Sequence, residues 1–178
     1  LHEVTLDTKE TRIIEQLSRH RRFFVDERTK QVERLHASLK TYYPLVLELF
    51  DDMTTKVFSD FVKRWPSLAA LKNATDNDLR AYFKSHKSNR ESVVKRRLSL
   101  IKAATPLTED EATITSAQLY TLGVIGQLEA LNATIKEYDR QIAHWLDQHD
   151  DKALFESFPS AGPVFAPRLL AAFGSDRE

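Results

Sequence analysis

The most regular feature of the chain is a hydrophobic seam in its last third. Between residues 114 and 145, seam positions recur at strictly alternating steps of three and four residues, and Thr121 is the polar member. The members are Ile114, Ala117, Thr121, Val124, Leu128, Leu131, Ile135, Tyr138, Ile142 and Trp145. This spacing is typical of a coiled coil, and at about 1.5 Å per residue it predicts a seam roughly 47 Å long. So narrow a stripe needs a second long helix along its side.

A candidate partner helix lies near the N-terminus, from about Asp7 to Tyr42. Asp7 and Glu10 have the spacing of a capping box, and apolar residues follow at heptad spacing. Pro44 ends this helix because it lacks an N–H and disfavours helical geometry at the preceding residue. The seam therefore packs on residues 7–42 of the same chain, antiparallel, or on the same helix of a second chain, and the two uses can coexist in a four-helix arrangement. A homodimer would use Ile114, Val124, Leu128, Leu131, Ile135, Tyr138, Ile142 and Trp145.

The segment between these helices predicts four short helices. Their expected N-caps are Asp51 or Asp52, Ser67, Thr75 or Asp76, and Ser88 or Asn89. Thr108 and Glu111 form a further capping-box pattern before the seam. The predicted fold is all-α, with parts at 1–50 (first long helix and its kinked extension), 51–104 (basic helical insert), 105–152 (second long helix) and 153–178 (start of a C-terminal domain).

Composition supports this fold and excludes several classes of protein. Only 4 of 178 residues are glycine, and hydrophobic residues make up 42% of the chain, which favours a helical protein with its own core. With no cysteine, the chain has no disulfide or thiolate metal site, which fits a reducing compartment. No apolar run approaches the roughly 20 residues of a membrane span, so no membrane role is expected.

Charge is balanced overall but unevenly distributed. Residues 51–104 carry 12 basic and 6 acidic side chains, whereas residues 105–178 carry 5 basic and 12 acidic. Within the insert, eight cations stand against Glu91 alone: Arg80, Lys84, Lys87, Arg90, Lys95, Arg96, Arg97 and Lys102. Such a cluster predicts phosphate contacts with nucleic acid. The alternative is a solvated helix face that pairs with the acidic last third.

The sequence contains few candidate catalytic residues. The clusters at 109–111 and 51–52 are carboxylates in first turns of predicted helices, where capping explains them. His144, Asp147 and Asp151 have metal-like spacing on one helix face, which leaves a metal-dependent enzyme as a third, weaker hypothesis. No glycine-rich phosphate loop is present.

The C-terminal segment from Phe158 to Val164 reads as a tight turn between two helices. In helix-hairpin-helix modules such a turn points backbone N–H groups at a DNA phosphate. Ser160, Gly162 and the downstream Arg168 are therefore further candidate nucleic-acid contacts, although Pro163 has no N–H to donate.

This segment is similar to the Pro-Gly-x-Gly-Pro stretch of one group of bacterial transposases, named for insertion sequences 110, 116 and 902; here Ser160 stands where a glycine is usual. The N-terminal half also resembles the region joining the two catalytic domains of that group. The matching landmarks, in order, are Arg21 to Thr29, Arg34-Leu35, Leu39 to Pro44, Leu49 to Asp51 and Phe61 to Pro66.

The resemblance implies a DNA recombinase that mobilises its own element. In the group, an N-terminal domain holds an acidic metal-binding set, using a divalent metal such as Mg²⁺, and a C-terminal domain supplies a serine nucleophile. We expect this chain to be an internal fragment that lacks both sets and needs no cofactor of its own. Expected partners are DNA, an element-encoded guide RNA and a second copy of the chain, in the bacterial cytoplasm at the nucleoid. The alternative is a non-catalytic helical scaffold without a nucleic-acid role.

Overall fold

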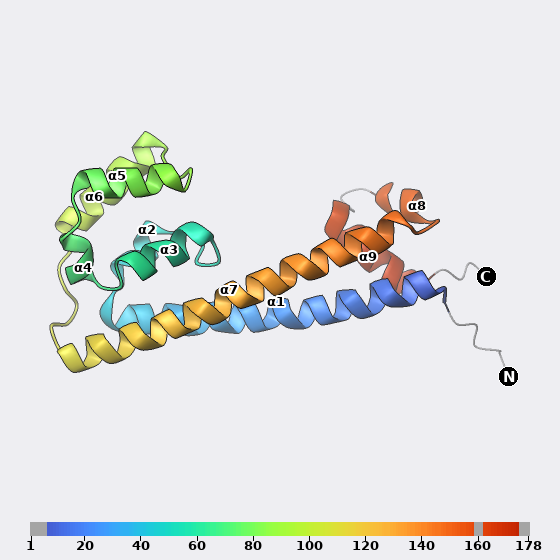
Figure 1. Ribbon diagram of the computed structural model, residues 1–178, viewed down its shortest axis with the longest axis horizontal. Coiled ribbons are helices and arrows are strands. Elements are labelled where there is room, and N and C mark those ends of the chain that lie inside the picture. The colour runs from blue at the N-terminus through green and yellow to red at the C-terminus, as the bar shows by residue number, and fades with distance from the viewer. Residues whose placement is uncertain (1–6, 159–161, 175–178) are drawn as a thin grey trace. The chain divides into compact units, whose positions relative to one another are not determined.

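The computed structural model describes residues 7–158 and 162–174, apart from the side chains of Pro163 and Val164. Over these residues it contains α-helices and no strands, which confirms the all-α prediction (Figure 1). The helices are α1 (Lys9–Tyr42), α2 (Leu45–Leu49), α3 (Lys56–Arg64), α4 (Leu68–Lys72), α5 (Asp76–Ser85), α6 (Glu91–Ala103), α7 (Glu111–Asp147), α8 (Lys152–Glu156) and α9 (Gly162–Phe173).

The predicted helices are present with small shifts at their ends. Helices α1 and α7 are the two long helices, and α3 to α6 are the four short helices expected between residues 51 and 104. Helix α1 ends before Pro44, which becomes the N-cap of the short helix α2. The break follows from the proline ring, which cannot continue the α1 hydrogen-bond ladder.

Some N-caps differ from the prediction. Ser67 and Thr75 cap α4 and α5 as expected, the latter in a capping box with Asp78. At α1, α3 and α7 another polar residue, nearer the first turn, takes the role. The backbone N–H groups of Thr11, Phe58 and Thr113 donate to the side chains of Thr8, Thr55 and Asp110, respectively. Helix α6 follows Arg90 and has no side-chain cap.

Contacts between residues divide the chain into two compact units. The insert unit comprises residues 29–130, and the terminal unit comprises the described residues of 1–28 and 131–178. Each unit therefore contains one part of α1 and one part of α7.

The core of the insert unit is rich in aromatic rings. Phe50 lies at its centre, with its ring centroid 5.7 Å from that of Phe58 and 5.0 Å from that of Phe61. Leu39 of α1 and Leu128 of α7 belong to the same buried cluster, so these parts of the two long helices pack together. Edge-to-face ring pairs of this kind add to the stabilisation from burial.

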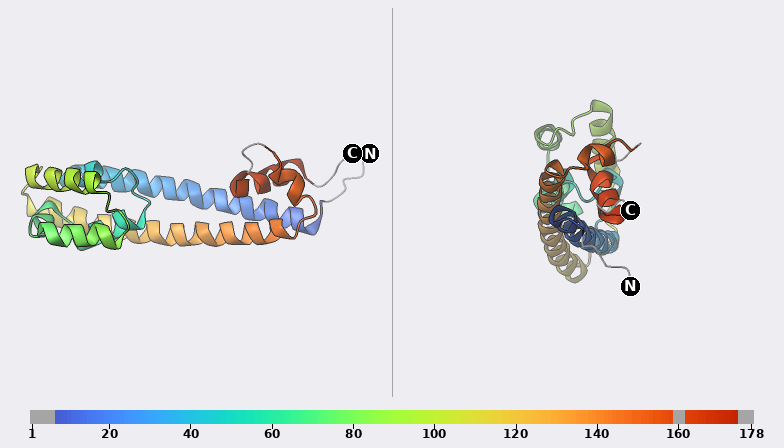
Figure 2. Two further views of the ribbon diagram at one scale, coloured as in Figure 1. Left: turned by 90° about the horizontal axis from the view of Figure 1, so that it is seen from above. Right: turned by 90° about the vertical axis from the view of Figure 1, so that its right-hand side faces the viewer.

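The terminal unit has a smaller core. Ile14 of α1, Leu146 of α7 and Leu170 of α9 are buried in one cluster. Along α1, contacts join Thr11 to His149, Arg21 to Asp139 and Arg28 to Asn132, so the partner numbers fall along α7 as they rise along α1. Figure 2 shows these parts of the two helices side by side. The long helices therefore pack together in this unit too.

Candidate nucleic-acid interface

Helices α5 and α6 pack against each other and carry the basic cluster. Leu79, Tyr82 and Phe83 of α5 are buried, as are Val94 and Leu98 of α6. Because these apolar residues recur at three- and four-residue spacing, each helix turns the intervening residues to solvent. Apart from the half-buried Arg80 and the buried Arg97, the cations of α5 and α6 lie on these exposed faces.

Five of the eight cations of the basic cluster have local partners, and four of these five lie at least partly on the surface. Arg80 pairs with Glu91 at 3.0 Å, with Lys95 3.8 Å from the same carboxylate. Lys102 pairs with Asp76 at 2.6 Å, and Arg96 donates to the Glu48 carbonyl oxygen at 2.7 Å. These partners lie within the insert unit and mostly within α5 and α6. The alternative in which the acidic last third neutralises the cluster therefore has no ion pair among the described residues.

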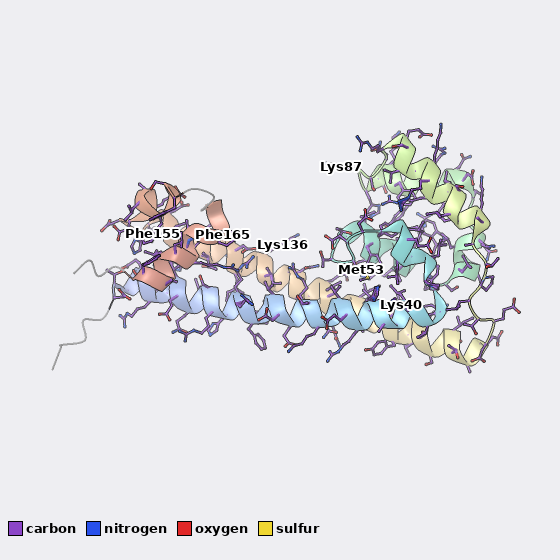
Figure 3. The ribbon with its side chains drawn as sticks, turned by 180° about the vertical axis from the view of Figure 1, so that it is seen from behind. Lys40, Met53, Lys87, Lys136, Phe155 and Phe165 are labelled. Carbon is purple, nitrogen blue, oxygen red and sulfur yellow. The ribbon has the colours of Figure 1, made fainter. Side chains whose placement is uncertain are left out.

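Three cations at the turn between α5 and α6 are exposed and make no ion pair within the described part of the chain. These are Lys84, Lys87 and Arg90, which we call the basic turn. Lys87 lies at the end of the helix pair (Figure 3). Three unpaired cations within seven residues concentrate positive potential at one point of the surface.

The backbone of the basic turn has an unusual residue at its sharpest position. Lys87 has φ +54°, in the left-handed region that favours glycine. The Ser88 N–H donates to the Phe83 carbonyl oxygen at 2.9 Å, closing the hydrogen-bond pattern of a Schellman motif at the end of α5. A lysine in this conformation costs roughly 1–2 kcal/mol relative to an unstrained backbone. No sequence signal marks this position.

Arg97, which the sequence groups with the basic cluster, is buried. Its side chain is only 8% exposed, and its guanidinium lies 4.8 Å from the Phe50 ring and 4.7 Å from the Phe83 ring. It donates to the Leu49 carbonyl oxygen and to Ser88 Oγ, both at 2.9 Å, and burial lowers its pKa. Arg97 therefore supports the basic turn from inside and does not belong to the exposed surface.

His86 is a second supporting residue, and the sequence gives no hint of its role. Its Nε2 lies 2.9 Å from Asp60 Oδ2, and its Nδ1 lies 3.0 Å from the Tyr82 carbonyl oxygen. Burial raises the pKa of Asp60, but the hydrogen bonds from His86 and Lys56 together lower it by more than burial raises it, so the pKa lies below its ordinary value. These contacts fix the end of α5 to α3.

The predicted hairpin contacts lie apart from the basic turn in sequence and belong to the terminal unit. Gly162 is exposed and has φ +42°, in the left-handed region that favours glycine. Arg168 lies 5.7 Å from the centroid of the Phe165 ring. Ser160 falls outside the described residues.

The seam proposed for a homodimer is covered by the chain itself. Its buried members are Val124, Leu128, Ile135 and Ile142, whereas Ile114, Leu131, Tyr138 and Trp145 are half-buried. In the insert unit the seam packs with Leu35 and Leu39 of α1. Of the two partners left open by the sequence, the structure thus places residues of the same chain on the seam.

Of the two carboxylate clusters, the one at 109–111 caps a helix through Asp110, whereas at 51–52 the capping role belongs to Thr55. Asp110 accepts the Ala112 and Thr113 N–H groups, and hydrogen bonds from Thr113 lower its pKa. His144 contacts Gln148, and Asp147 pairs with Lys152. Nowhere in the described ranges do three His, Asp or Glu side chains gather to hold a metal ion, including the divalent metal that the resemblance implies.

Comparison with protein-family models, with curated proteins and with solved structures gives no match for this chain. No helix in the described ranges combines the length and apolar character needed to cross a bilayer.

Proposed function

We propose that this chain is the central region of a DNA transposase, where it binds nucleic acid through the basic turn and pairs subunits. In this proposal the cutting is done by residues that the chain does not contain. Helices α1 and α7 act as an antiparallel coiled coil, which the falling partner numbers along α7 support. The start of α9 acts as part of a helix-hairpin-helix module, which the positive φ of Gly162 supports.

The observation that carries the nucleic-acid part is the basic turn itself. Lys84, Lys87 and Arg90 project from a pair of packed helices without a neutralising carboxylate among the described residues. Lys87 also occupies a strained backbone position where glycine would be more stable. Strain of this kind is found preferentially at functional positions.

Aromatic burial favours contact with phosphates rather than with bases. Proteins that bind single strands without sequence preference usually stack bases on exposed aromatic rings. In residues 51–104 every aromatic ring is in or beside the buried core: Phe58, Phe61, Trp65, Tyr82 and Phe83. The basic turn therefore suits the backbone of duplex DNA or of folded RNA, read by charge.

The direct test reverses the three charges together, as Lys84→Glu, Lys87→Glu and Arg90→Glu. Binding of a short DNA duplex and of an RNA hairpin is measured by fluorescence anisotropy over a range of salt. We expect at least about tenfold weaker binding and a salt slope lower by roughly 2–3, because each lost phosphate contact removes about 0.9 from the slope.

The matched control is Arg34→Glu, Lys40→Glu and Lys72→Glu. It makes the same charge change at exposed positions of the same unit. If both triple variants weaken binding equally, the effect is one of net charge and the basic turn is not the site. If neither wild-type protein nor control binds either probe at low salt, the nucleic-acid role is wrong.

A second variant, Lys87→Gly, separates binding from folding. Glycine adopts a positive φ without strain, so the free energy of unfolding should rise by about 1 kcal/mol. Binding should weaken, since one cation is lost. A loss of stability would show that Lys87 makes a structural contribution instead.

A helical scaffold without nucleic-acid binding has one observation in its favour. Arg80, Lys95 and Lys102 are paired with Glu91 and Asp76, so part of the basic cluster is satisfied within the insert unit. Such a scaffold would ignore both probes, and the anisotropy measurement decides between the two functions.

A further inference from the structure

Helix α7 carries a second heptad stripe on the side opposite its buried seam. The stripe follows steps of four and three residues and consists of Ala112, Ser116, Leu119, Gly123, Gly126 and Ala130, which we call the outer stripe. It is offset by two residues from seam positions such as Ile114 and Val124, which corresponds to about 200° around the helix. All six residues are exposed, and all belong to the insert unit.

The two glycines of the outer stripe form a hollow that the chain itself does not use. An added Cβ at Gly123 or at Gly126 would meet no atom within 4 Å. Glycine in a helix interior costs about 1 kcal/mol relative to alanine. Packing within the chain therefore does not explain these glycines, whereas close approach of a partner from outside would.

A large apolar side chain stands one helical turn from this hollow. Leu119 is 76% exposed, and its neighbour Tyr120 is 50% exposed. The same face also lacks charge, because residues 112–128 contain no Lys, Arg, Asp or Glu in a chain of which 29% is charged. Exposed apolar side chains on an uncharged face are typical of interaction surfaces.

We infer that a second copy of this chain packs on the outer stripe, with the two α7 helices antiparallel. In a two-fold dimer the same surface of both copies is in contact, so that surface must be complementary to itself. A projecting side chain and a hollow on the same face provide this complementarity, and an uncharged face avoids repulsion between like charges. Residues 119 and 126 are equally far from the midpoint between Leu122 and Gly123. An antiparallel pair centred there places Leu119 of each copy in the hollow at Gly126 of the other.

This inference rests on the subunit-pairing part of the proposed function and assigns that pairing to a surface. The buried seam stays within each chain, where Leu35 and Leu39 cover it. The outer stripe then joins the two chains, so both faces of α7 are used.

The key variant is Gly126→Leu, followed by sedimentation velocity of the full chain over a range of concentrations. Filling the hollow should weaken the dimer at least about tenfold, since the Leu119 side chain of the second copy loses its place. In the same variant the fold should be at least as stable as wild type, because the new side chain meets nothing within the chain and a helix glycine is removed.

The swapped variant Leu119→Gly with Gly126→Leu tests the register. In the antiparallel pair it exchanges projection and hollow, so the dimer should recover most of the affinity lost in Gly126→Leu. Ala37→Leu is the control, since it enlarges an exposed residue on α1, and it should dimerise as wild type does.

The outcomes separate the two proposals. A wild-type chain that stays monomeric at high micromolar concentration removes subunit pairing and this inference with it. A dimer that Gly126→Leu leaves intact keeps subunit pairing but shows that another surface carries it. A dimer that Gly126→Leu weakens and the swap does not restore overturns the antiparallel register.

Discussion

Arg97 shows why the residue type alone does not define a nucleic-acid contact. In the sequence it is one of three consecutive cations with Lys95 and Arg96. In the fold it lies on the inner face of α6, where its guanidinium donates to the Leu49 carbonyl oxygen and to Ser88. Arg97 thus links the end of α2 to Ser88, the residue that directly follows Lys87. Reversing its charge would test folding rather than binding.

We therefore predict that Arg97→Ala lowers the free energy of unfolding by about 2–4 kcal/mol. The change removes two hydrogen bonds from a charged donor, leaves the Leu49 carbonyl oxygen without that partner and opens space between two rings. Arg97→Lys should lose less, because it keeps the charge but not the planar fork.

Lys95→Ala is the comparison for Arg97→Ala in urea unfolding. Its side chain is largely exposed, so its stability should change by no more than about 0.5 kcal/mol. Equal stability of the two alanine variants would return Arg97 to the exposed surface and to the list of candidate contacts.

At the scale of elements, the sequence predicts helices well where periodicity is long. The heptad seam from Ile114 to Trp145 identifies α7, and Pro44 identifies the end of α1. N-caps are less predictable, because several polar residues precede each helix and the local backbone conformation decides which side chain reaches the free N–H groups. Asp52, for example, accepts from the Thr54 N–H, and it is Thr55 that caps α3.

The candidate site is only partly predictable for a different reason. Charge density along the sequence finds the basic cluster, but it does not show which cations meet a carboxylate across the helix pair. The Arg80–Glu91 pair spans eleven positions, and the left-handed backbone of Lys87 depends on how α5 ends. Both features need the tertiary arrangement of α5 and α6.

Thr121, the polar member of the seam, has a specific partner in the fold. Its side chain is fully buried, and its Oγ1 lies 2.9 Å from Ser38 Oγ of α1. The pair satisfies two hydroxyls where α1 and α7 pack together in the insert unit. A polar residue at a single seam position can select the register of two helices at some loss of stability.

We predict that Thr121→Val lowers the free energy of unfolding by about 1 kcal/mol, since it leaves the Ser38 hydroxyl without this partner. The double variant Ser38→Ala with Thr121→Val should be close to wild type, because both partners are then apolar. Urea unfolding of the four proteins gives the coupling energy. Losses that simply add would show that the two hydroxyls do not depend on each other.

At the scale of the whole molecule, stability should fall at alkaline pH because tyrosines are buried. Burial raises the pKa of Tyr42, Tyr43 and Tyr82 above the ordinary value of 10.0. Above about pH 10 the unfolded chain releases tyrosine protons that the folded chain keeps. Unfolding then becomes more favourable as pH rises, by up to about 1.4 kcal/mol per pH unit for each such tyrosine.

Tyr43 is the best position for testing this dependence. Its side chain is 1% exposed, and its hydroxyl is buried without a hydrogen-bond partner among the described residues, whereas the Tyr82 hydroxyl donates to the Val57 carbonyl oxygen. Removing the Tyr43 hydroxyl therefore removes a proton that the fold retains but no hydrogen bond. At neutral pH, Tyr43→Phe should be as stable as wild type or more stable by about 1 kcal/mol.

Above about pH 10, the free energy of unfolding of Tyr43→Phe should decline less steeply with pH than that of wild type. The two slopes should differ by up to about 1.4 kcal/mol per pH unit, the effect of one proton. Urea unfolding at stepped pH values measures both curves. Tyr120→Phe, made on a half-exposed ring, reports the effect of losing a hydroxyl at neutral pH, where we expect no change. Parallel curves for wild type and Tyr43→Phe would mean that the Tyr43 hydroxyl reaches water in the folded chain, and a loss of stability at neutral pH would mean that it has a partner after all.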